Sequence, residues 1–600
     1  MARAIFDATG GEVRLALPLG LGKPLNLVNA LTRLAAADPG LRLEIFTALT
    51  LQRPDPSSEI ERRFLEPASN RIFGTSPALH YVEMIKEGSM PVNITVSEFF
   101  FQAGTWLGNS YAQQHYISAN YTHARDVLIA QKPNVLAQLM PRKRGHFSMS
   151  CNTDISADLF RLRAEGEMDF LAVAEENAAL PFMGGPAALE PAEIGMVLAP
   201  EHEIDLFSVP RRPVSEAQYA IGLHVSRLVE DGGTLQVGIG AIGDAVTHAL
   251  LLRDRSALHE IWETAPFSLT GTGTAPFREG LYAVTEMLVG GLLALFEAGV
   301  LRREVEGAVV EAGFFVDARD MYARLRALPA EQRAKIRMQP VSFTNALYGD
   351  EETKRAARVK ARFVNSAMQV SLLGDAMSDA AKPGQVVSGV GGQFDFFEQA
   401  HALADGRAVL TLPATREKGG KVTSNIAWQL PLTTVPRHMR DIVVTEYGAA
   451  DLWGQTDEEV IKRLLAITDS RFQEGLRVQA VEAGKLDADY CLPSVLQRNS
   501  PGMLKGWLAP HRASLLPDFP LGTDFTPIEA VLLPALDMLS NAASSKRALA
   551  KLIWDSLRLS PHVQEAEAME RMGYDAMPGF TEALQSRVLR GALRQVAAQS

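Results

Sequence analysis

Cysteine is almost missing from this chain of 600 residues, which contains only Cys151 and Cys491. Two cysteines are too few for a disulfide framework or for the ligand set of a structural zinc site. Long hydrophobic runs are missing as well. The longest, LVGGLLALF at residues 288–296, is far shorter than the ~20 apolar residues of a membrane-spanning helix, and it ends at Glu297. The sequence therefore predicts neither a disulfide-stapled nor a membrane-spanning protein.

Positive charge is also in short supply. The chain has 59 Lys and Arg against 70 Asp and Glu, a formal net charge of −11. General nucleic-acid binding needs a basic field and is not expected, so an anionic ligand would have to be held by a local cluster of amides and cations. The first 20 residues place Glu12 and Arg14 before a short apolar stretch and show no A-x-A-like processing site. We expect a cytoplasmic enzyme with no membrane partner.

The chain is too long for one hydrophobic core, and its pattern divides into three parts. Residues 1–207 alternate strand-like runs, such as LRLEIFTAL and NVLAQLM, with helical patterns such as PLNLVNALTRLAAA. After the linker SVPRRPVSE, the alternation restarts over residues 214–480, with strands expected at TLQVGIG, LYAVTE, GAVVEA, RFVNSA, AVLTLP and DIVVTE. Such alternation predicts two tandem open α/β domains with largely parallel strands.

The third part, residues 485–600, begins with a proline-rich linker that breaks up regular elements. The sequence Thr526-Pro527-Ile528-Glu529 then forms a capping box with proline at the first helical position, which predicts that a helix begins there. Beyond it the pattern is helical, and Leu549, Leu552, Ile553 and Leu557 are expected on one face. We predict a mainly helical C-terminal extension.

A glycine loop, GIGAIG at residues 238–243, lies between an expected strand and an expected helix. It matches the G-x-G-x-x-G fingerprint of dinucleotide sites. Such sites also place an acidic residue at the end of the next strand, ~20 residues on. Here Glu260 and Glu263 lie inside LHEIWETA, which is not a clean apolar strand. The loop alone leaves three interpretations open: a dinucleotide site, a site for another phosphate-bearing ligand, or a tight turn without a ligand.

Two segments of the second half favour a long ligand with several phosphates. VVSGVGGQFDF at 386–396 places three glycines after a strand, and LPATREKGGKVTS at 412–424 adds Arg416, Lys418 and Lys421 around two more. Glycines let backbone amides approach a ligand closely, and lysines meet phosphates as point charges. The alternative for the two lysines is a solvated hairpin tip.

Two glutamates are candidates for chemistry. LYAVTEMLVGGLLALFEAG at 281–299 predicts a strand, a cap at Thr285 and then a helix. This places Glu286 at a helix N-terminus, where the dipole would keep the carboxylate ionised and able to act as a nucleophile. The alternative is an ordinary acidic residue of a first helical turn. Glu446, in DIVVTEYGAADLWG, follows another strand and is either a second site carboxylate or a turn residue.

Taken in order, GIGAIG, TEM, VNSAMQV, SGVGGQFDF, LPATREKGGKVTS and VVTEYGAADLWG resemble the acetyl-CoA hydrolase/transferase family. That family includes 4-hydroxybutyrate and succinyl-CoA:acetate CoA-transferases. The resemblance is dense over residues 210–475, thinner before them, where GHFSMSCNTD and AVAEEN match, and undetectable beyond about 485. It implies CoA-transferase-type α/β domains, coenzyme A as a co-substrate, no metal or other cofactor, and a homodimer.

The resemblance also implies roles for individual residues. Glu286 would form a glutamyl-CoA thioester in a ping-pong reaction between an acyl-CoA and a carboxylate, and amides near Ile239 and Gly392 would stabilise the oxyanions. The residues expected to contact coenzyme A are Gly238, Ile239, Gly240, Ala241, Ile242, Met368, Gly392 and Lys421. Asn365 and Glu446 are expected near the site.

The sequence departs from the family around the glutamate. Val284 stands where the family commonly has His or Tyr, Gly243 replaces a usual proline, and PFSLTGTGTAPFREG belongs to an insertion before Glu286. A more apolar surround would raise the pKa of Glu286 and suit a less polar acyl group. Three alternatives remain: hydrolysis of the same thioester by water, coenzyme A binding without catalysis, and an NAD oxidoreductase, which the missing ribose-binding acid disfavours.

Overall fold

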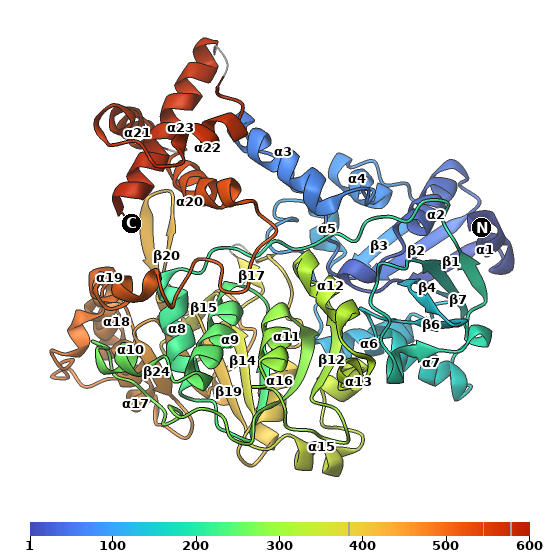
Figure 1. Cartoon of the computed structure of the whole chain (residues 1–600). Coiled ribbons are helices and arrows are strands. Elements are labelled where there is room, and N and C mark those ends of the chain that lie inside the picture. The colour runs from blue at the N-terminus through green and yellow to red at the C-terminus, as the bar shows by residue number, and fades with distance from the viewer. Residues whose placement is uncertain (382–383, 544, 576–578, 600) are drawn as a thin grey trace.

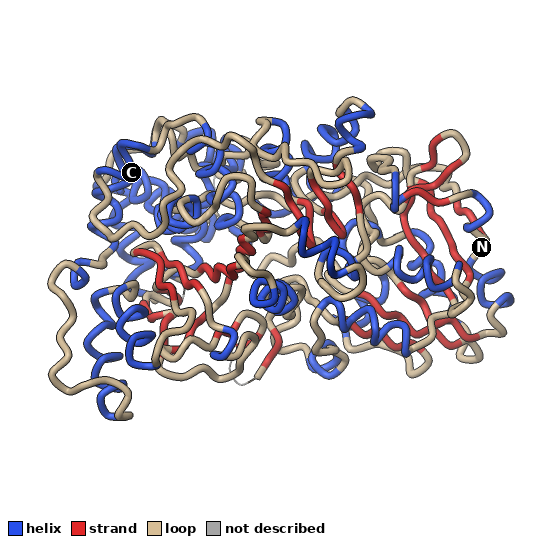
Figure 2. Tube along the Cα trace, turned by 90° about the horizontal axis from the view of Figure 1, so that it is seen from below, coloured by secondary structure: helices blue, strands red, loops and turns tan. Residues whose placement is uncertain are grey.

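The computed structural model describes residues 1–381, 384–543, 545–575 and 579–599. Two open sheets with surrounding helices lie side by side, and a helical C-terminal part lies above them (Figure 1). Seen from below, the N-terminus and the C-terminal helices are at opposite ends of the molecule (Figure 2). The predicted α/β class with a helical extension is confirmed. Within the described residues, no helix combines the length and apolar character needed to cross a membrane.

The first sheet is wholly parallel and contains the strands expected at LRLEIFTAL and NVLAQLM. Its order is β3 (Ile94–Glu98), β2 (Arg42–Thr47), β1 (Glu12–Ala16), β4 (Val135–Met140), β7 (Leu171–Glu176) and β9 (Met196–Leu198). Its helices are α1 (Ala2–Ala8), α2 (Leu25–Ala37), α3 (Glu59–Phe73), α4 (His80–Glu87), α5 (Ser110–Gln114), α6 (Tyr121–Ala130) and α7 (Ser156–Ala164). All six residues of β4, VLAQLM, are buried, as expected of a parallel strand covered on both faces.

The second sheet holds the glycine loop and both candidate glutamates. Its order is β13 (Ile336–Met338), β12 (Val310–Phe315), β11 (Tyr282–Leu288), β10 (Thr234–Val237), β14 (Arg362–Ser366), β19 (Arg407–Thr411), β23 (Ile442–Thr445) and β24 (Gly448–Asp451), and only the last pair is antiparallel. The strands expected at TLQVGIG, LYAVTE, GAVVEA, RFVNSA, AVLTLP and DIVVTE are all present.

Eleven helices accompany this sheet in the described residues: α8 (Glu216–Ser226), α9 (Ala241–Asp254), α10 (His259–Glu263), α11 (Gly290–Glu297), α12 (Arg319–Ala327), α13 (Ala330–Ala334), α14 (Val341–Thr344), α15 (Glu351–Ala357), α16 (Gln393–Ala402), α17 (Asp457–Ala466) and α18 (Ser470–Glu482). Short strands form the hairpin of β20 (Thr415–Lys418) and β21 (Lys421–Ser424) and smaller ladders: β5 (Arg142–Lys143), β6 (His146–Ser148), β8 (Ala188–Leu189), β15 (Gln369–Ser371), β16 (Ala376–Met377), β17 (Ala380–Ala381), β18 (Gln385–Val386) and β22 (Ile426–Ala427).

A short segment joins the two sheets beside the candidate site. The backbone N–H groups of Thr153 and Asp154 donate to the carbonyl of Gly313 in β12, at 3.1 and 3.0 Å. On the same strand, the N–H of Phe315 donates to the carbonyl of Cys151. These bonds fix Asp154, which follows the first domain's hairpin, against the strand next to β11.

The C-terminal extension contains α19 (Pro501–Arg512), α20 (Pro527–Ala542), α21 (Lys546–Arg558), α22 (Glu565–Arg571) and α23 (Phe580–Gln599). The predicted capping box is confirmed, because Thr526 Oγ1 accepts the N–H of Glu529 and Glu529 Oε2 accepts the N–H of Thr526.

The expected apolar face of α21 is wrong at one position. Leu552 is 3% exposed, whereas Leu557 is 66% exposed. At 100° per residue, five residues place Leu557 about 140° around the helix from Leu552, away from α23. The close approach of the two helices is at Leu552, whose carbonyl faces Gly591.

Candidate active site

Glu286 lies inside strand β11 and not at a helix N-terminus, which corrects the sequence prediction. The pairing of β11 with β12 continues past it, from Thr285 opposite Ala312 to Leu288 opposite Phe315. Helix α11 begins only at Gly290, and the side chain of Thr285 donates to the carbonyl of Met287 and does not cap a helix. The pairing of β11 with β12 therefore overrides the helical pattern, and the helix dipole does not act on this carboxylate as expected.

Two hydrogen-bond donors approach the Glu286 carboxyl group. Asn345, directly after α14, donates from Nδ2 to Glu286 Oε2 at 3.0 Å. The same amide nitrogen lies 3.3 Å from Asp395 Oδ2, so its two protons serve two carboxyl groups. The Thr344 hydroxyl donates to Asn345 Oδ1 at 2.9 Å and fixes the orientation of the amide. The second donor is the backbone N–H of Gly392.

The second glycine turn lies directly on this carboxyl group. A Cβ atom on Gly392 would come within 1.9 Å of Glu286 Oε2 and 2.1 Å of Asn345 Nδ2. The φ of Gly392 is −92°, which any residue adopts, so glycine is required here for close approach and not for backbone conformation. The structure thus brings together Glu286 and Gly392, two residues that the sequence placed in one site.

Burial raises the pKa of Glu286 to about 8. The hydrogen bonds from Asn345 and Gly392 lower it, and the charges of Asp395 and Asp154 raise it. At pH 7 this carboxyl group is therefore about one-tenth ionised. The raised pKa has the direction expected from a less polar surround, but it contradicts the expectation that a helix dipole keeps this group ionised.

The neighbouring carboxyl groups are held by the first domain. Tyr121, the first residue of α6, donates its hydroxyl to the Asp154 carboxyl group, and Thr122 donates its hydroxyl to Asp395 Oδ1 at 2.8 Å. Burial raises the pKa values of Asp154 and Asp395 to about 6 each. The site is therefore built from both domains.

The sequence did not predict most of the residues around the Glu286 carboxyl group. Asn345 lies in VSFTNALYG and Tyr121 in ISANYTHARD, and neither stretch carries a motif with a known chemical spacing. Asp154 is the last residue of GHFSMSCNTD, which resembles the family. This resemblance is the one signal in the sequence that points to Asp154. Among the described residues, no group of three or more His, Cys, Asp or Glu side chains is placed to hold a metal ion.

The first glycine loop lies beside Glu286 because β10 pairs with β11. Gly238 directly follows β10, and its N–H donates to the carbonyl of Val364 on β14. Gly240 has a φ of +111°, and α9 begins at the next residue, Ala241. A Cβ on Gly243 would come within 2.2 Å of the Gly238 carbonyl oxygen, so this glycine lets the turn close tightly.

Ile239 in this loop has an exposed side chain, and Ile242, in the first turn of α9, is partly buried. Asn365, on β14, donates from Nδ2 to Gln236 Oε1 at 3.3 Å, and Met368, which follows β14, is 37% exposed. Glu286, the glycine loop and these two residues thus lie on adjacent parallel strands, toward the carboxyl ends of those strands.

Lys421 and Glu446 lie further along the carboxyl edge of the sheet. Lys421 pairs with Lys418 across the exposed tip of the hairpin, so the solvated-tip alternative agrees with its position. Glu446 follows β23 and is 4% exposed, and its Oε2 accepts the N–H of Ala414 at 2.7 Å. Burial raises the pKa of Glu446 to about 7. Its carboxylate therefore holds the start of the hairpin segment.

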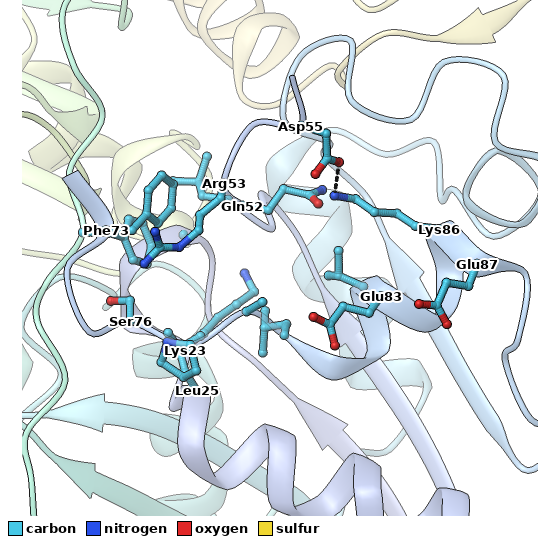
Figure 3. A pocket seen from close by; sticks show the side chains of 17 residues that line it. Lys23, Leu25, Gln52, Arg53, Asp55, Phe73, Ser76, Glu83, Lys86 and Glu87 are labelled. Carbon is cyan, nitrogen blue, oxygen red and sulfur yellow. Dashed lines mark hydrogen bonds and ion pairs between the residues drawn. The ribbon is translucent and has the colours of Figure 1, made fainter. Parts of the chain in front are cut away.

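A cavity of about 440 Å³ lies in the first domain, between α2, α3 and α4 (Figure 3). Its lining combines apolar side chains, among them Leu51, Phe73 and Phe207, with the charged side chains of Lys23, Arg53, Asp55, Glu83, Lys86 and Glu87. Lys23 is the buried cation of the lining, and its Nζ donates to the Ala48 carbonyl at 2.6 Å.

Burial lowers the pKa of Lys23 to about 8, against the opposing effects of Glu98 and Asp154. Next to Lys23, Gly22 packs against the Asn152 side chain, whose Nδ2 donates to Asp154 Oδ2 at 3.4 Å.

Comparisons with known proteins agree with this architecture. Residues 318–480 match the model of the acetyl-CoA hydrolase/transferase C-terminal domain. The 4-hydroxybutyrate coenzyme A transferase of Clostridium kluyveri is 28% identical over 341 residues, which cover 56% of this chain and 69% of the relative. The succinyl-CoA:acetate/propanoyl-CoA:succinate CoA transferase of Fasciola hepatica is 26% identical over 58% of this chain and 64% of its own.

Solved structures show the same fold. RipA from Yersinia pestis aligns with a TM-score of 0.57 at 21% identity, covering 81% of this chain and 100% of RipA. The 4-hydroxybutyrate CoA-transferase from Porphyromonas gingivalis gives 0.54 at 20% identity, with 80% and 96% covered. The chain is thus similar to the acetyl-CoA hydrolase/transferase family over its second α/β domain and to CoA transferases over more than half of its length, which identifies it as an enzyme.

Proposed function

We propose that this enzyme transfers coenzyme A between an acyl-CoA and a free carboxylate, through a glutamyl-CoA thioester on Glu286. The observation that carries the proposal is the contact of the Glu286 carboxyl group with two amide donors, Asn345 Nδ2 and the Gly392 N–H, at the edge where both domains meet. The relatives named as CoA transferases support transfer of coenzyme A as the reaction.

The reaction starts from the ionised form of Glu286, whose proton has been released to solvent. A carboxylate oxygen then attacks the thioester carbonyl carbon, the C–S bond breaks, and an anhydride and a CoA thiolate result. The thiolate attacks the glutamyl carbonyl carbon, and the acyl group leaves as a carboxylate. A second acid takes the coenzyme A by the reverse steps, which gives ping-pong kinetics.

Donors are available for the negative charge of each step. Asn345 donates to Glu286 Oε2 and the Gly392 N–H donates to the same carboxyl group, so both are available when the thiolate attacks and a glutamyl oxygen becomes an oxyanion. The Ile239 amide, in the glycine loop on the neighbouring strand, is our proposed donor for the oxyanion of the acyl carbonyl. One such donor is typically worth ~10²–10³ in rate.

We place coenzyme A along the carboxyl edge of the second sheet, over residues Gly238 to Ile242 and beside Met368, with Lys421 at the outer end. Asn365 and Glu446 lie at strand ends along the same edge and support this path. We place the part of the acid beyond its carboxyl group in the 440 Å³ cavity, where the side chains of Leu51, Phe73 and Phe207 would contact a less polar chain. The proposal also includes a cytoplasmic homodimer, for which light scattering tests the mass in solution.

Hydrolysis is the second candidate, because water can resolve the same thioester. The two are separated by measuring CoA release from butyryl-CoA with and without added acetate. Release that is unaffected by acetate, with no acetyl-CoA formed, favours a hydrolase. Formation of acetyl-CoA at the expense of free CoA favours transfer.

The decisive experiment is intact-protein mass spectrometry after mixing the enzyme with acetyl-, butyryl-, succinyl- and 4-hydroxybutyryl-CoA without an acceptor. Borohydride treatment before digestion locates the thioester. We expect a CoA adduct on Glu286 that is lost in Glu286→Ala and retained in Glu260→Ala, a matched change of an exposed glutamate. Coenzyme A binding by calorimetry with no adduct from any donor would overturn the proposal and favour a non-catalytic binding protein.

A further inference from the structure

The C-terminal extension is the part of this chain that the family does not explain. The family model ends at residue 480, and about a fifth of the chain has no counterpart in RipA, which is covered over its whole length. In the structure, helices α20 to α23 do not stand alone. They share a hydrophobic cluster with Phe64 of α3, a helix of the first domain, and Ile60 and Leu65 of α3 pack against that cluster. Figure 1 shows α3 running from the first domain to the extension.

Helix α3 lacks one backbone hydrogen bond, and the extension supplies a donor in its place. Pro67 lies inside α3 and has no N–H, so the carbonyl of Arg63, four residues earlier, cannot receive its helical hydrogen bond. Arg571 of α22 donates to that carbonyl from Nη1 at 3.0 Å, and its Nη2 donates to the carbonyl of Phe64 at 3.0 Å. A backbone acceptor that would otherwise be left unpaired is therefore satisfied from the extension.

An ion cluster centred on a buried carboxylate joins the same elements. Glu529 of α20 has no exposed surface and is bonded by two guanidinium groups, Arg571 at 2.7 Å and Arg71 of α3. Arg71 also donates to the carbonyl of Asp524, which precedes α20. A buried carboxylate between two cations fixes α3 relative to the extension, because removing either partner leaves an uncompensated charge.

The other end of α3 forms a wall of the cavity. Phe73, its last residue, lines the cavity and stacks on Phe207, with ring centroids 5.7 Å apart. Arg53 lies over the Phe73 ring at 5.4 Å and donates to the carbonyl of Gly74 and to Asn70 Oδ1. Figure 3 shows Arg53 and Phe73 together on one side of the cavity, opposite Glu83 and Lys86 of α4. The position of α3 therefore sets the width of the cavity.

We propose that the C-terminal extension determines acyl specificity by clamping α3 as the wall of the cavity that receives the acid. This inference rests on the proposed function, which assigns that cavity to the acid. Arg571 and Glu529 are positioning residues in this account, since they act on the substrate through α3 and Phe73 without touching it.

The test uses the full chain and Glu529→Gln, which removes the charge that holds the two arginines. The matched control is Glu567→Gln, an exposed glutamate of α22. Because losing a buried ionic partner is strongly destabilising, Arg571→Lys is a second variant that keeps the charge but loses the paired carbonyl contacts. The measurements are hydrogen exchange of residues 51–79 and kcat/KM for acetyl-, butyryl- and hexanoyl-CoA with a fixed acceptor.

We expect the clamp variants to exchange α3 amides about tenfold faster, because fewer contacts hold the helix closed. One methylene in a formed apolar pocket is worth roughly tenfold or more in kcat/KM, so the hexanoyl to acetyl ratio should change about tenfold. The dissociation constant of coenzyme A should stay the same, and the control should match the parent in all three readouts. Faster exchange with an unchanged acyl ratio would overturn the proposal and leave the extension a purely structural role.

Failure of the proposed function gives a different result. If the parent turns over none of the acyl-CoAs, the cavity is tested directly with hexanoate by titration calorimetry. Binding to the parent that is about tenfold weaker in Glu529→Gln supports the clamp, a difference of about 1.4 kcal/mol. Equal affinity, or no binding to the parent, overturns it.

Discussion

Removing the amide of Asn345 should move the pH at which Glu286 becomes a nucleophile. Asn345 Nδ2 donates to Glu286 Oε2 at 3.0 Å, and this bond favours the ionised carboxylate against the burial that raises its pKa to about 8. A hydrogen bond to a charged group contributes about 1.5–3 kcal/mol. At 1.36 kcal/mol per unit, its loss in Asn345→Ala raises the pKa by roughly one to two units.

The consequence for the rate follows from the ionised fraction. At pH 7 that fraction falls from about a tenth to between about a hundredth and a thousandth, so thioester formation should slow about 10- to 100-fold from this cause alone. Loss of an oxyanion donor adds a factor of ~10²–10³ that does not depend on pH. Asn345→Asp should raise the midpoint further, because it adds another carboxyl group to Glu286, Asp395 and Asp154.

The assay is single-turnover thioester formation with butyryl-CoA, followed by quenching and mass spectrometry between pH 6 and 10. Asn541→Ala, an exposed asparagine of α20, is the matched control and should keep the parent profile. A slower Asn345→Ala whose midpoint is unchanged would refute the reasoning, since the amide would then act only on the oxyanion.

Three further predictions follow from single contacts. Gly392→Ala should abolish thioester formation while the chain still folds, because its Cβ would lie 1.9 Å from Glu286 Oε2, whereas Gly502→Ala in α19, which has open space around it, should be unaffected in the same assay. Glu286→Gln should reduce the loss of folding stability between pH 5 and 8. In the folded parent the Glu286 pKa is raised to about 8, so the carboxyl group still holds a proton that the unfolded chain has already released. The parent therefore loses stability as pH rises through this window, and the variant lacks this contribution. Urea unfolding midpoints at both pH values measure this difference. Leu552→Ala, at a position 3% exposed, should lower the free energy of unfolding of the extension by about 2–4 kcal/mol.

Each of these three predictions has an outcome that would contradict it. A Gly392→Ala enzyme with the parent's adduct yield would mean that the loop moves away from Glu286 in solution. Equal pH slopes for parent and Glu286→Gln would mean that this carboxyl group is ionised in the native state at neutral pH. Leu557→Ala, at a position 66% exposed, is the control for Leu552→Ala, and equal losses from both would place α21 differently from the structure.

Periodicity predicted most of the fold because its elements are local. The strands around LRLEIFTAL, TLQVGIG and DIVVTE, the helix after GIGAIG, and the capping box at Thr526 are all present. The error at Glu286 shows the limit of this reasoning. TEMLVGG suits either a strand or a helical turn, and the pairing of β11 with β12, which no local pattern encodes, decided for the strand.

The sequence by itself determined the family resemblance, the alternation of strands and helices, and the pairing of Glu286 with the glycines of SGVGGQFDF in one site. Tertiary structure decided the rest of the site. Asn345, Tyr121 and Asp154 come from three separate segments, and only the docking of the two domains places them around one carboxyl group. The raised pKa of Glu286 is likewise a tertiary property. It depends on how much water packing excludes and on which charges lie nearby, and neither quantity can be read from the residues beside Glu286 in the chain.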